Sequence, residues 1–173
     1  MGKALIGLGI IFLLIAVAGK VEYTVYESTE ELPLPPMGSA TGWAPLPIPD
    51  IAGLVDLEVT ASWEGSIYWL GVTSIDEAQR CDPDAQTKVS LTCSGNDIDF
   101  EVGGPQSSST TIDWSVESGE WYACIGQNGG SLAQINDLSV DIKASAKLTN
   151  TAAGVLMGVG LGFILLGLVL KKR

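Results

Sequence analysis

The sequence predicts an all-β fold: a single antiparallel β-sandwich of about seven strands, with an apolar segment at each end of the chain. Three observations predict it. Apolar and polar residues alternate with a period of two over much of residues 53–149. Both ends of the chain have long uncharged stretches, and 173 residues are enough for one ordinary domain plus terminal segments.

The N-terminal segment, residues 1–20, has two interpretations. Residues 4–19 carry no charge, and as a helix they would span about 24 Å, less than the ~30 Å hydrocarbon core of a bilayer. The sequence AVA at 16–18, after a basic start at Lys3, has the form of a signal-peptide cleavage site. A retained transmembrane anchor is the alternative, with the Lys20 side chain reaching back to the interface.

Residues 21–52 are expected to form an extended, proline-rich arm, which begins with a strand-like alternation at 21–27. Residues 28–50 contain six of the eight prolines. Proline fixes φ and has no backbone donor, so neither a helix nor a central strand should run through this segment. We expect a semi-rigid, polyproline-like arm that lies along the domain and buries Trp43, Leu46 and Ile48.

The β-sandwich itself is assigned to residues 53–149, because short alternating segments follow one another there at the spacing of a sandwich. The longest alternation, 138–148, ends next to the C-terminal apolar segment, so the sandwich should lie close to a membrane. Single strands are predicted at 54–62, 66–72, 88–94, 97–102 and 138–148, and a hairpin is predicted from 110–116 and 120–126.

Two of these segments resemble the cysteine strands of an immunoglobulin domain. They are SLTCSG around Cys93 and WYACIG, in which Tyr122 and Cys124 take the places of a tyrosine corner. The two cysteines are only about half as far apart as that family requires, and Trp114 lies beyond the usual place for its tryptophan. The resemblance therefore implies a sandwich architecture and not membership of the family.

Three cysteines, Cys81, Cys93 and Cys124, predict one disulfide and one remaining thiol if the domain faces an oxidising compartment. Pairing of Cys81 with Cys93 is favoured, because closing this short loop could contribute ~3 kcal/mol. Pairing of Cys93 with Cys124, which would join two strands, is the alternative. The remaining thiol is expected to be buried and inert, or else to link two molecules.

Residues 150–170 are predicted to form a transmembrane helix. Residues 151–170 are uncharged and reach about 30 Å as a helix, and 171–173 form a basic tail. Basic residues stay on the cytoplasmic side, so the tail and Lys3 both predict cytoplasmic ends and an extracytoplasmic domain. The localisation expected is a cell membrane or envelope.

Three glycines, Gly154, Gly158 and Gly162, recur every four residues in this helix and predict a close packing face. The first apolar segment, with Gly7 and Gly9, is the nearest expected partner. A second copy of the chain or another membrane protein is the alternative partner, and glycine is also simply common in membrane helices.

Charge and composition exclude several classes of function. Asp and Glu outnumber Lys and Arg by 20 to 9, which argues against nucleic-acid binding and against docking on an acidic membrane surface. The chain contains no histidine, which removes imidazole bases, Ser-His and Cys-His nucleophile pairs and most zinc or copper sites. We therefore expect no enzyme activity and no cofactor.

Carboxylates are the remaining candidates for a site. Residues 97–102 are predicted as a strand, which would place alternate acids on one face next to an acidic loop. Such crowding could attract calcium, while a solvated acidic face in a salt-adapted protein is the alternative. The candidate cation ligands are Asp82, Asp84, Asp97, Asp99 and Glu101.

The function expected from these observations is that of an integral membrane structural or interaction protein. Its acidic sandwich would be a non-catalytic subunit of a membrane or envelope assembly, with the lipid bilayer and other membrane proteins or copies of itself as partners. The alternative is a cell-surface receptor or adhesin that binds a cation, a sugar or a protein.

Overall fold

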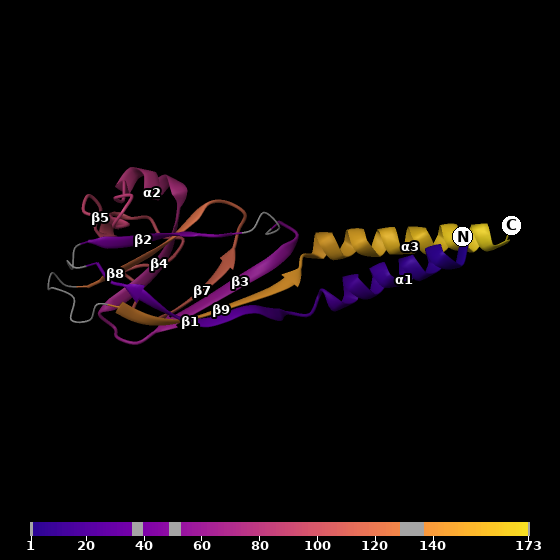
Figure 1. Ribbon diagram of the computed structural model, residues 1–173, viewed down its shortest axis with the longest axis horizontal. Helices are drawn as coiled ribbons and strands as arrows, with labels where there is room; N and C mark the ends of the chain where they lie inside the picture. Colours follow the sequence, from indigo (N-terminus) through magenta and orange to yellow (C-terminus); the bar gives the residue numbers. More distant parts are fainter. Residues whose placement is uncertain (1, 36–39, 49–52, 129–136, 173) are drawn as a thin grey trace.

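The computed structural model describes residues 2–35, 40–48, 53–128 and 137–172. It consists of two antiparallel sheets with a helix at each end of the chain. Figure 1 shows the sheets at one end of an elongated molecule and the two helices side by side at the other. The predicted all-β domain is therefore confirmed in its coarse form, as two facing sheets in a sandwich-like arrangement.

The first sheet has the strand order β1-β9-β3-β7. Strand β9 (Asp137–Leu148) pairs on one side with β1 (Tyr23–Pro33) and on the other with β3 (Val55–Trp63), and β7 (Thr111–Val116) completes the sheet. The alternation predicted for β3, β7 and β9 is confirmed, with every second residue of β7 buried.

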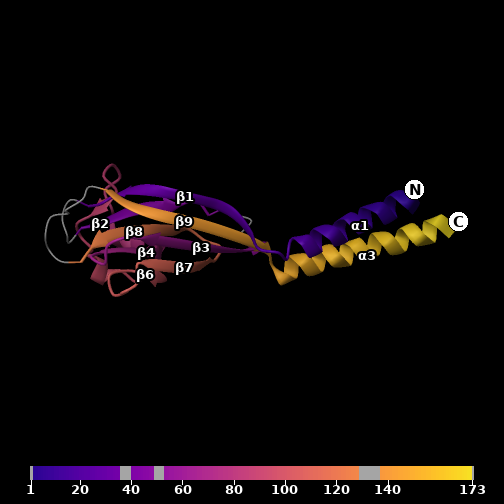
Figure 2. The ribbon, with the colours of Figure 1, turned by 90° about the horizontal axis from the view of Figure 1, so that it is seen from below.

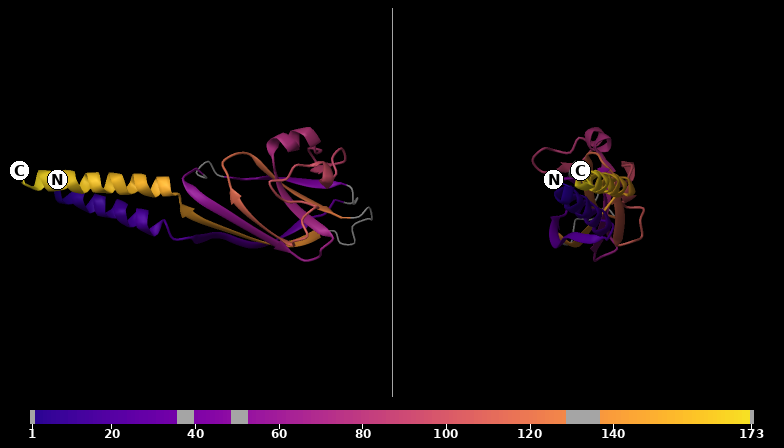
Figure 3. Two further views of the ribbon diagram at one scale, coloured as in Figure 1. Left: turned by 180° about the vertical axis from the view of Figure 1, so that it is seen from behind. Right: turned by 90° about the vertical axis from the view of Figure 1, so that its right-hand side faces the viewer.

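The second sheet has the strand order β5-β2-β8-β4-β6. Its three longer strands are β2 (Thr41–Leu46), β8 (Trp121–Gln127) and β4 (Tyr68–Ser74), and its edges are two-residue strands, β5 (Val89–Ser90) and β6 (Val102–Gly103). A short helix, α2 (Ile75–Cys81), lies on its outer side, away from the first sheet (Figures 1 and 3). Six of the seven residues of β4 are buried, because this strand is covered on both faces.

The proline-rich arm expected at 21–52 is corrected by the structure. Strand β1 pairs along its length with β9, and β2 pairs with β8, so the segment belongs to both sheets. Proline is tolerated here because Pro33 ends an edge strand and Pro45 lies where β5 no longer pairs with β2. Trp43 is buried as expected; residues 36–39 and 49–52 lie outside the described residues.

The predicted hairpin at 110–126 is wrong. Strand β7 pairs with β3 in the first sheet, and β8 pairs with β2 and β4 in the second. The connection between them crosses from one sheet to the other, so their side chains meet across the core. The Trp114 and Trp121 rings touch edge to face, with centroids 5.4 Å apart.

The strands predicted at 88–94 and 97–102 shrink to β5 and β6. Between them lies a turn of 3₁₀ helix, Gly95–Asp97, which is closed by reciprocal hydrogen bonds between Ser94 and Asp97. Such local bonds compete with pairing to a neighbouring strand. Leu91, expected to face the core, is 73% exposed.

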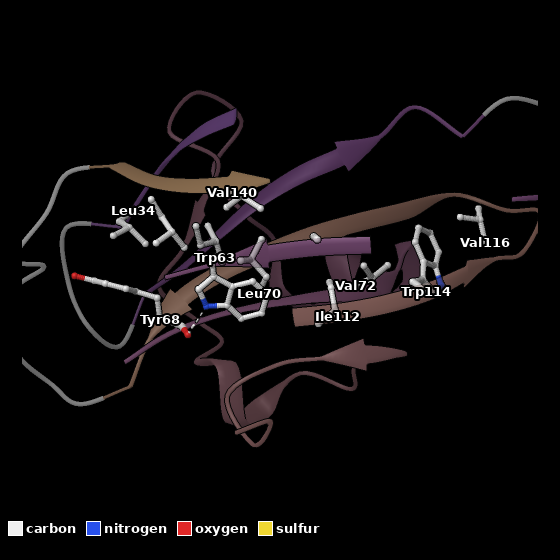
Figure 4. Packing of buried hydrophobic residues seen from close by; sticks show 12 residues of the cluster. Leu34, Trp63, Tyr68, Leu70, Val72, Ile112, Trp114, Val116 and Val140 are labelled. Atoms are coloured by element: carbon white, nitrogen blue, oxygen red, sulfur yellow. Dashed lines mark hydrogen bonds between the residues drawn. The ribbon is translucent and has the colours of Figure 1, made fainter. Parts of the chain in front are cut away.

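Two hydrophobic clusters hold the sheets. The larger one lies between the sheets and takes buried side chains from β3, β4, β7, β8 and β9. Figure 4 shows nine labelled members, including Trp63, whose Nε1–H donates to the Tyr68 carbonyl oxygen at 3.0 Å. The smaller cluster lies under α2 on the outer face of the second sheet and contains Trp43, Trp69 and all three cysteines.

The two terminal helices, α1 (Gly2–Ala18) and α3 (Asn150–Lys172), run antiparallel along each other. Figures 1 and 2 show both leaving the same end of the sheets. At this end the Leu148 N–H donates to the Gly19 carbonyl oxygen at 2.6 Å, and the Lys20 ammonium donates to the Asn150 side chain. Thus α1 and α3 are tied together where they join β1 and β9.

Small residues make the helix contact, but they are not the glycines that the sequence suggested. A Cβ built at Gly9 would lie 2.5 Å from the Gly160 carbonyl oxygen, whereas one at Gly154, Gly158 or Gly162 would meet nothing within 4 Å. Gly7 likewise has open space around it. The buried small residues repeat every seven positions on both helices: Gly2, Gly9 and Ala16 on α1, and Ala153, Gly160 and Gly167 on α3.

The seven-residue spacing of the helix contact has a physical reason. A seven-residue repeat keeps one seam of each helix facing its partner over the full contact, whereas a four-residue row turns away from it. Glycine and alanine in the seam let the two backbones approach closely. The row Gly154, Gly158 and Gly162 lies outside the seam.

We expect Gly160→Leu to force α1 and α3 apart, because its side chain would collide with the backbone of Gly9. Overpacking of this kind costs ~1–3 kcal/mol. The readout is oxidative cross-linking between Phe12→Cys and Phe163→Cys, since these two rings stack with centroids 5.9 Å apart. Cross-linking should fall with Gly160→Leu and persist with the matched variant Gly158→Leu; equal loss in both would contradict the assigned seam.

Candidate functional site

The predicted disulfide joins Cys81, the last residue of α2, to Cys93, with the Cα atoms 5.4 Å apart. Two hydroxyls, from Ser90 and Thr92, each donate to the Cys81 carbonyl oxygen at 2.6 Å. The disulfide and these bonds fix the loop between α2 and the 3₁₀ turn onto the second sheet.

Cys124 is the free cysteine, and it is buried in β8 at 1% exposure. Burial raises the pKa of its thiol far above the ordinary value, and the nearby Glu77 carboxylate adds to this effect. A thiol held in its neutral form is a poor nucleophile, so the environment of Cys124 is that of a structural residue.

Arg80 connects α2 to the loop that follows the disulfide. Its guanidinium donates to the Glu77 carboxylate at 2.6 Å and to the Asp97 carbonyl oxygen. The Glu77 carboxylate also accepts the Asp99 N–H at 3.1 Å. The hydrogen bond from Arg80 is the main reason that the pKa of Glu77 is lowered.

Two of the candidate cation ligands serve as local caps. The Asp84 carboxylate accepts the N–H groups of Gln86 and Thr87 at 2.9 and 2.7 Å. The Asp97 carboxylate accepts the hydroxyl and the N–H of Ser94 at 2.6 and 2.9 Å. These hydrogen bonds lower the pKa of both carboxyls, and their oxygens already have partners within the chain.

The other three candidates do not converge with them. Asp82 ends α2 in the left-handed conformation, with φ 41°. Asp99 and Glu101 are exposed and belong to the irregular segment that replaces the expected strand, so no pleat aligns them. Among the described residues, no group of three Cys, Asp or Glu side chains is placed to hold a metal ion.

Acid should destabilise this part of the molecule. A carboxyl whose pKa is lowered in the folded state stabilises it at high pH, and that stability is lost as the pH falls through the lowered pKa. The ordinary values are 4.5 for Glu77 and 3.8 for Asp84 and Asp97. We expect the melting temperature to fall on acidification below these values.

The check is thermal unfolding of the full chain as a function of pH. Asp97→Asn should flatten the acid limb of the profile, because the amide cannot gain a proton. Glu101→Gln, an exposed carboxyl of the same loop, is the control. A profile that is equally steep in wild type and Asp97→Asn would contradict the assignment.

The most prominent feature with the chemistry of a binding site is an apolar cavity of about 1150 Å³ between the sheets. Its walls come from the inward faces of both sheets. The charged members among the described lining residues, Asp84 and Lys88, are exposed side chains of the loop before β5. The inward-facing walls are made by residues such as Leu57, Val72, Ile112, Trp114, Val140 and Ala144.

The volume of the cavity is too large for a closed and empty void. Engineered cavities cost ~24 cal/mol per Å³, so an empty void of this volume would cost roughly 28 kcal/mol. Whole domains are stable by only ~5–15 kcal/mol. Cavities that bind small molecules usually measure ~300–1,000 Å³, so this space is somewhat larger than an ordinary ligand site. It must therefore be filled or open to its surroundings.

Burial of the inward-facing side chains decreases toward the helices on β3 and β9, although the lining of the cavity also reaches Leu34 and Lys88 near the far end of the sheets (Figure 1). On β9 the inward residues at the far end, Leu138 and Val140, are 2% and 0% exposed, and those nearer α3 are half-buried. Strand β3 shows the same gradient in the opposite chain direction, from half-buried Val55 to Trp63 at 6% exposure. The first half of β1 is exposed throughout, and Tyr26 there lines the cavity at 47% exposure.

Two of the described residues that line the cavity, Trp114 and Trp43, carry an indole N–H without a partner. Trp114 is 6% exposed, and its Nε1–H finds no acceptor in the part of the chain that the structure describes. Buried donors are normally hydrogen-bonded, and leaving one unpaired costs ~1–3 kcal/mol. The Trp43 Nε1–H is also unpaired, but its ring packs in the smaller cluster under α2.

Sequence reasoning missed this cavity. The alternation marks which side chains face inward, but it carries no information on how far apart the two sheets lie. Comparison of the chain with protein-family models, with curated proteins and with solved structures finds no match. The function is therefore argued from the residues of the chain itself.

Proposed function

We propose that the chain is an integral membrane protein, held by a hairpin of α1 and α3, that presents a non-catalytic β-sandwich on the extracytoplasmic side. The observation that carries the proposal is the paired helices at one end of the sheets. By length and composition α3 could cross a membrane, and α1 is a shorter apolar helix. Large apolar side chains cover the outside of the pair, among them Leu14 at 64% and Leu165 at 64% exposure.

Exposed side chains of this kind need an apolar surrounding. The packing of α1 against α3 supports retention of residues 1–20 as an anchor instead of removal as a signal peptide. The disulfide supports an oxidising, extracytoplasmic location for the sheets. The basic residues Lys3 and Lys171 at the far end of the hairpin support cytoplasmic chain ends.

The experiment uses sealed, right-side-out vesicles and a maleimide that cannot cross membranes. The maleimide reacts with Lys88→Cys on the exposed loop before β5. We expect labelling in intact vesicles. A variant labelled only after lysis would reverse the topology, and a chain that leaves the membrane in sodium carbonate would overturn the anchor.

A binding module at the cell surface is the second candidate, and the cavity favours it. A structural subunit needs a filled core, whereas this core is half-buried over the end that faces α1 and α3. The alternative ligands expected from the sequence were a cation, a sugar or a protein. The apolar wall argues against a cation and against a sugar, because both require converging polar groups.

A further inference from the structure

We propose that the inter-sheet cavity binds a hydrocarbon chain of a membrane lipid, entering from the bilayer beside α1 and α3. This inference rests on the proposed membrane anchoring. It assigns a class of ligand, membrane lipids, to the sandwich. The lipid chain would enter the cavity from the bilayer.

The chemistry of the wall selects the ligand. The inward-facing residues of β3, β4, β7 and β9 that line it are aliphatic or aromatic, for example Val59, Val72, Ile112 and Ile142. A hydrocarbon chain fills such a space without leaving a polar group unpaired. The open cavity is larger than one small solute requires, which suits a long flexible chain.

The indole N–H of Trp114 also requires a hydrogen-bond acceptor from the ligand. Its Nε1–H is buried and unpaired among the described residues, and the ring lines the cavity. A lipid carries ester, ether or carbonyl oxygens at one end of its chain, and each can accept a hydrogen bond. A lipid therefore suits the apolar wall and can also supply an acceptor for the Trp114 donor.

The decrease in burial along β3 and β9 points to the membrane as the source, and we place the opening of the cavity at that end of the core. Strand β9 ends at Leu148, and α3 begins at Asn150, so the half-buried end of the core lies next to the helix pair. Exposed apolar side chains line the route from the helices to the opening. They are Val21, Tyr23, Val25, Tyr26 and Leu54, which are between 47% and 59% exposed.

The test uses the full chain in vesicles of phosphatidylcholine whose acyl chains carry bromine, a contact quencher of tryptophan fluorescence. All five tryptophans belong to the sheets and none to α1 or α3, so quenching requires hydrocarbon among the strands. We expect quenching in wild type relative to vesicles of the same lipid without bromine. Trp114→Phe keeps the apolar ring, removes the N–H, and should lose a large part of the quenching.

A matched pair of variants locates the contact. Ala144→Phe adds a ring inside the cavity, and Lys143→Phe adds the same ring on the outer face of the same strand. Quenching should be lost with Ala144→Phe and kept with Lys143→Phe. If both variants are quenched like wild type, and Trp114→Phe is too, hydrocarbon touches the protein elsewhere and the proposal is wrong.

Flotation of the same samples separates the two proposals. Protein that floats with the vesicles but shows no quenching overturns lipid binding and leaves the anchor intact. Protein that does not float overturns the anchor and the lipid site together. Organic extraction of the detergent-purified chain gives a second readout. Wild type should retain bound lipid, and Ala144→Phe should retain less. A stoichiometric polypeptide found in place of lipid would show that the cavity holds a segment of a partner protein.

Discussion

Replacing Trp69 with alanine should lower the free energy of unfolding by about 3–5 kcal/mol, the range for removing a buried tryptophan or phenylalanine side chain. Trp69 is 4% exposed on the outer face of β4. Its ring lies so close over Gly126 of β8 and Gly95 of the 3₁₀ turn that a Cβ at either would approach it to 2.3 and 2.5 Å. Phe100 touches it edge to face at 5.5 Å.

The ring thus joins the second sheet to the segment that covers it, and alanine would leave a void between them. Thermal unfolding of the full chain in detergent is the measurement, and a loss of this size corresponds to about 10–20 °C in melting temperature. Ile67→Ala is the control, because Ile67 is 44% exposed. A midpoint for Trp69→Ala no lower than that of the control would refute the packing.

Removing the disulfide should have the next largest effect. In the double variant Cys81→Ala, Cys93→Ala, the loss of the cross-link over a separation of 12 residues is expected to cost about 3 kcal/mol. The cost is moderated because Ser90 and Thr92 still bond to the carbonyl oxygen of residue 81. The loop should become the first part of the domain to open.

Melting temperatures measured with and without a reductant test the disulfide in the unmutated chain. We expect it to lower the melting temperature of wild type and to leave that of the double variant unchanged. Limited trypsin digestion reports the loop directly, since Lys88 is an exposed cleavage site inside it. Cys124→Ala is the control, and it should keep its sensitivity to reductant. Equal melting of reduced and oxidised wild type would show that the cross-link contributes no stability.

The sequence predicted the strands that have one buried and one exposed face. In β7, and in β9 as far as Ala144, the period of two is regular because one face meets the core and the other meets solvent; beyond it Ser145 is buried beside Glu22. It failed where pairing is not local: proline obscured β2 and the second half of β1, and the pattern predicted one hairpin from β7 and β8. Alternation identifies a strand's inner face but not the sheet to which it belongs.

For the candidate sites, other features decided how much the sequence could predict. The short loop between Cys81 and Cys93 favoured their pairing, which the structure shows, but spacing alone left the pairing of Cys93 with Cys124 open. A strand at 97–102 would align the acids on one face, whereas local capping by Ser94 turns the chain there. The helix seam was present in the sequence as small residues seven apart on both helices. The four-residue glycine row was more conspicuous and concealed it.

The pairing of β1 with β9 also sets the order in which the molecule can be completed during synthesis. Glu22 and Ser145, which bond at 2.7 Å beside this pairing, are 123 positions apart. The first strand to leave the ribosome must therefore wait, without a partner strand, until the last strand, β9, is made. Long-range pairing of this kind is slow, and an unpaired edge invites contact with other nascent chains. Closure of the first sheet and delivery of α3 to its final place thus become late, nearly simultaneous steps of biogenesis.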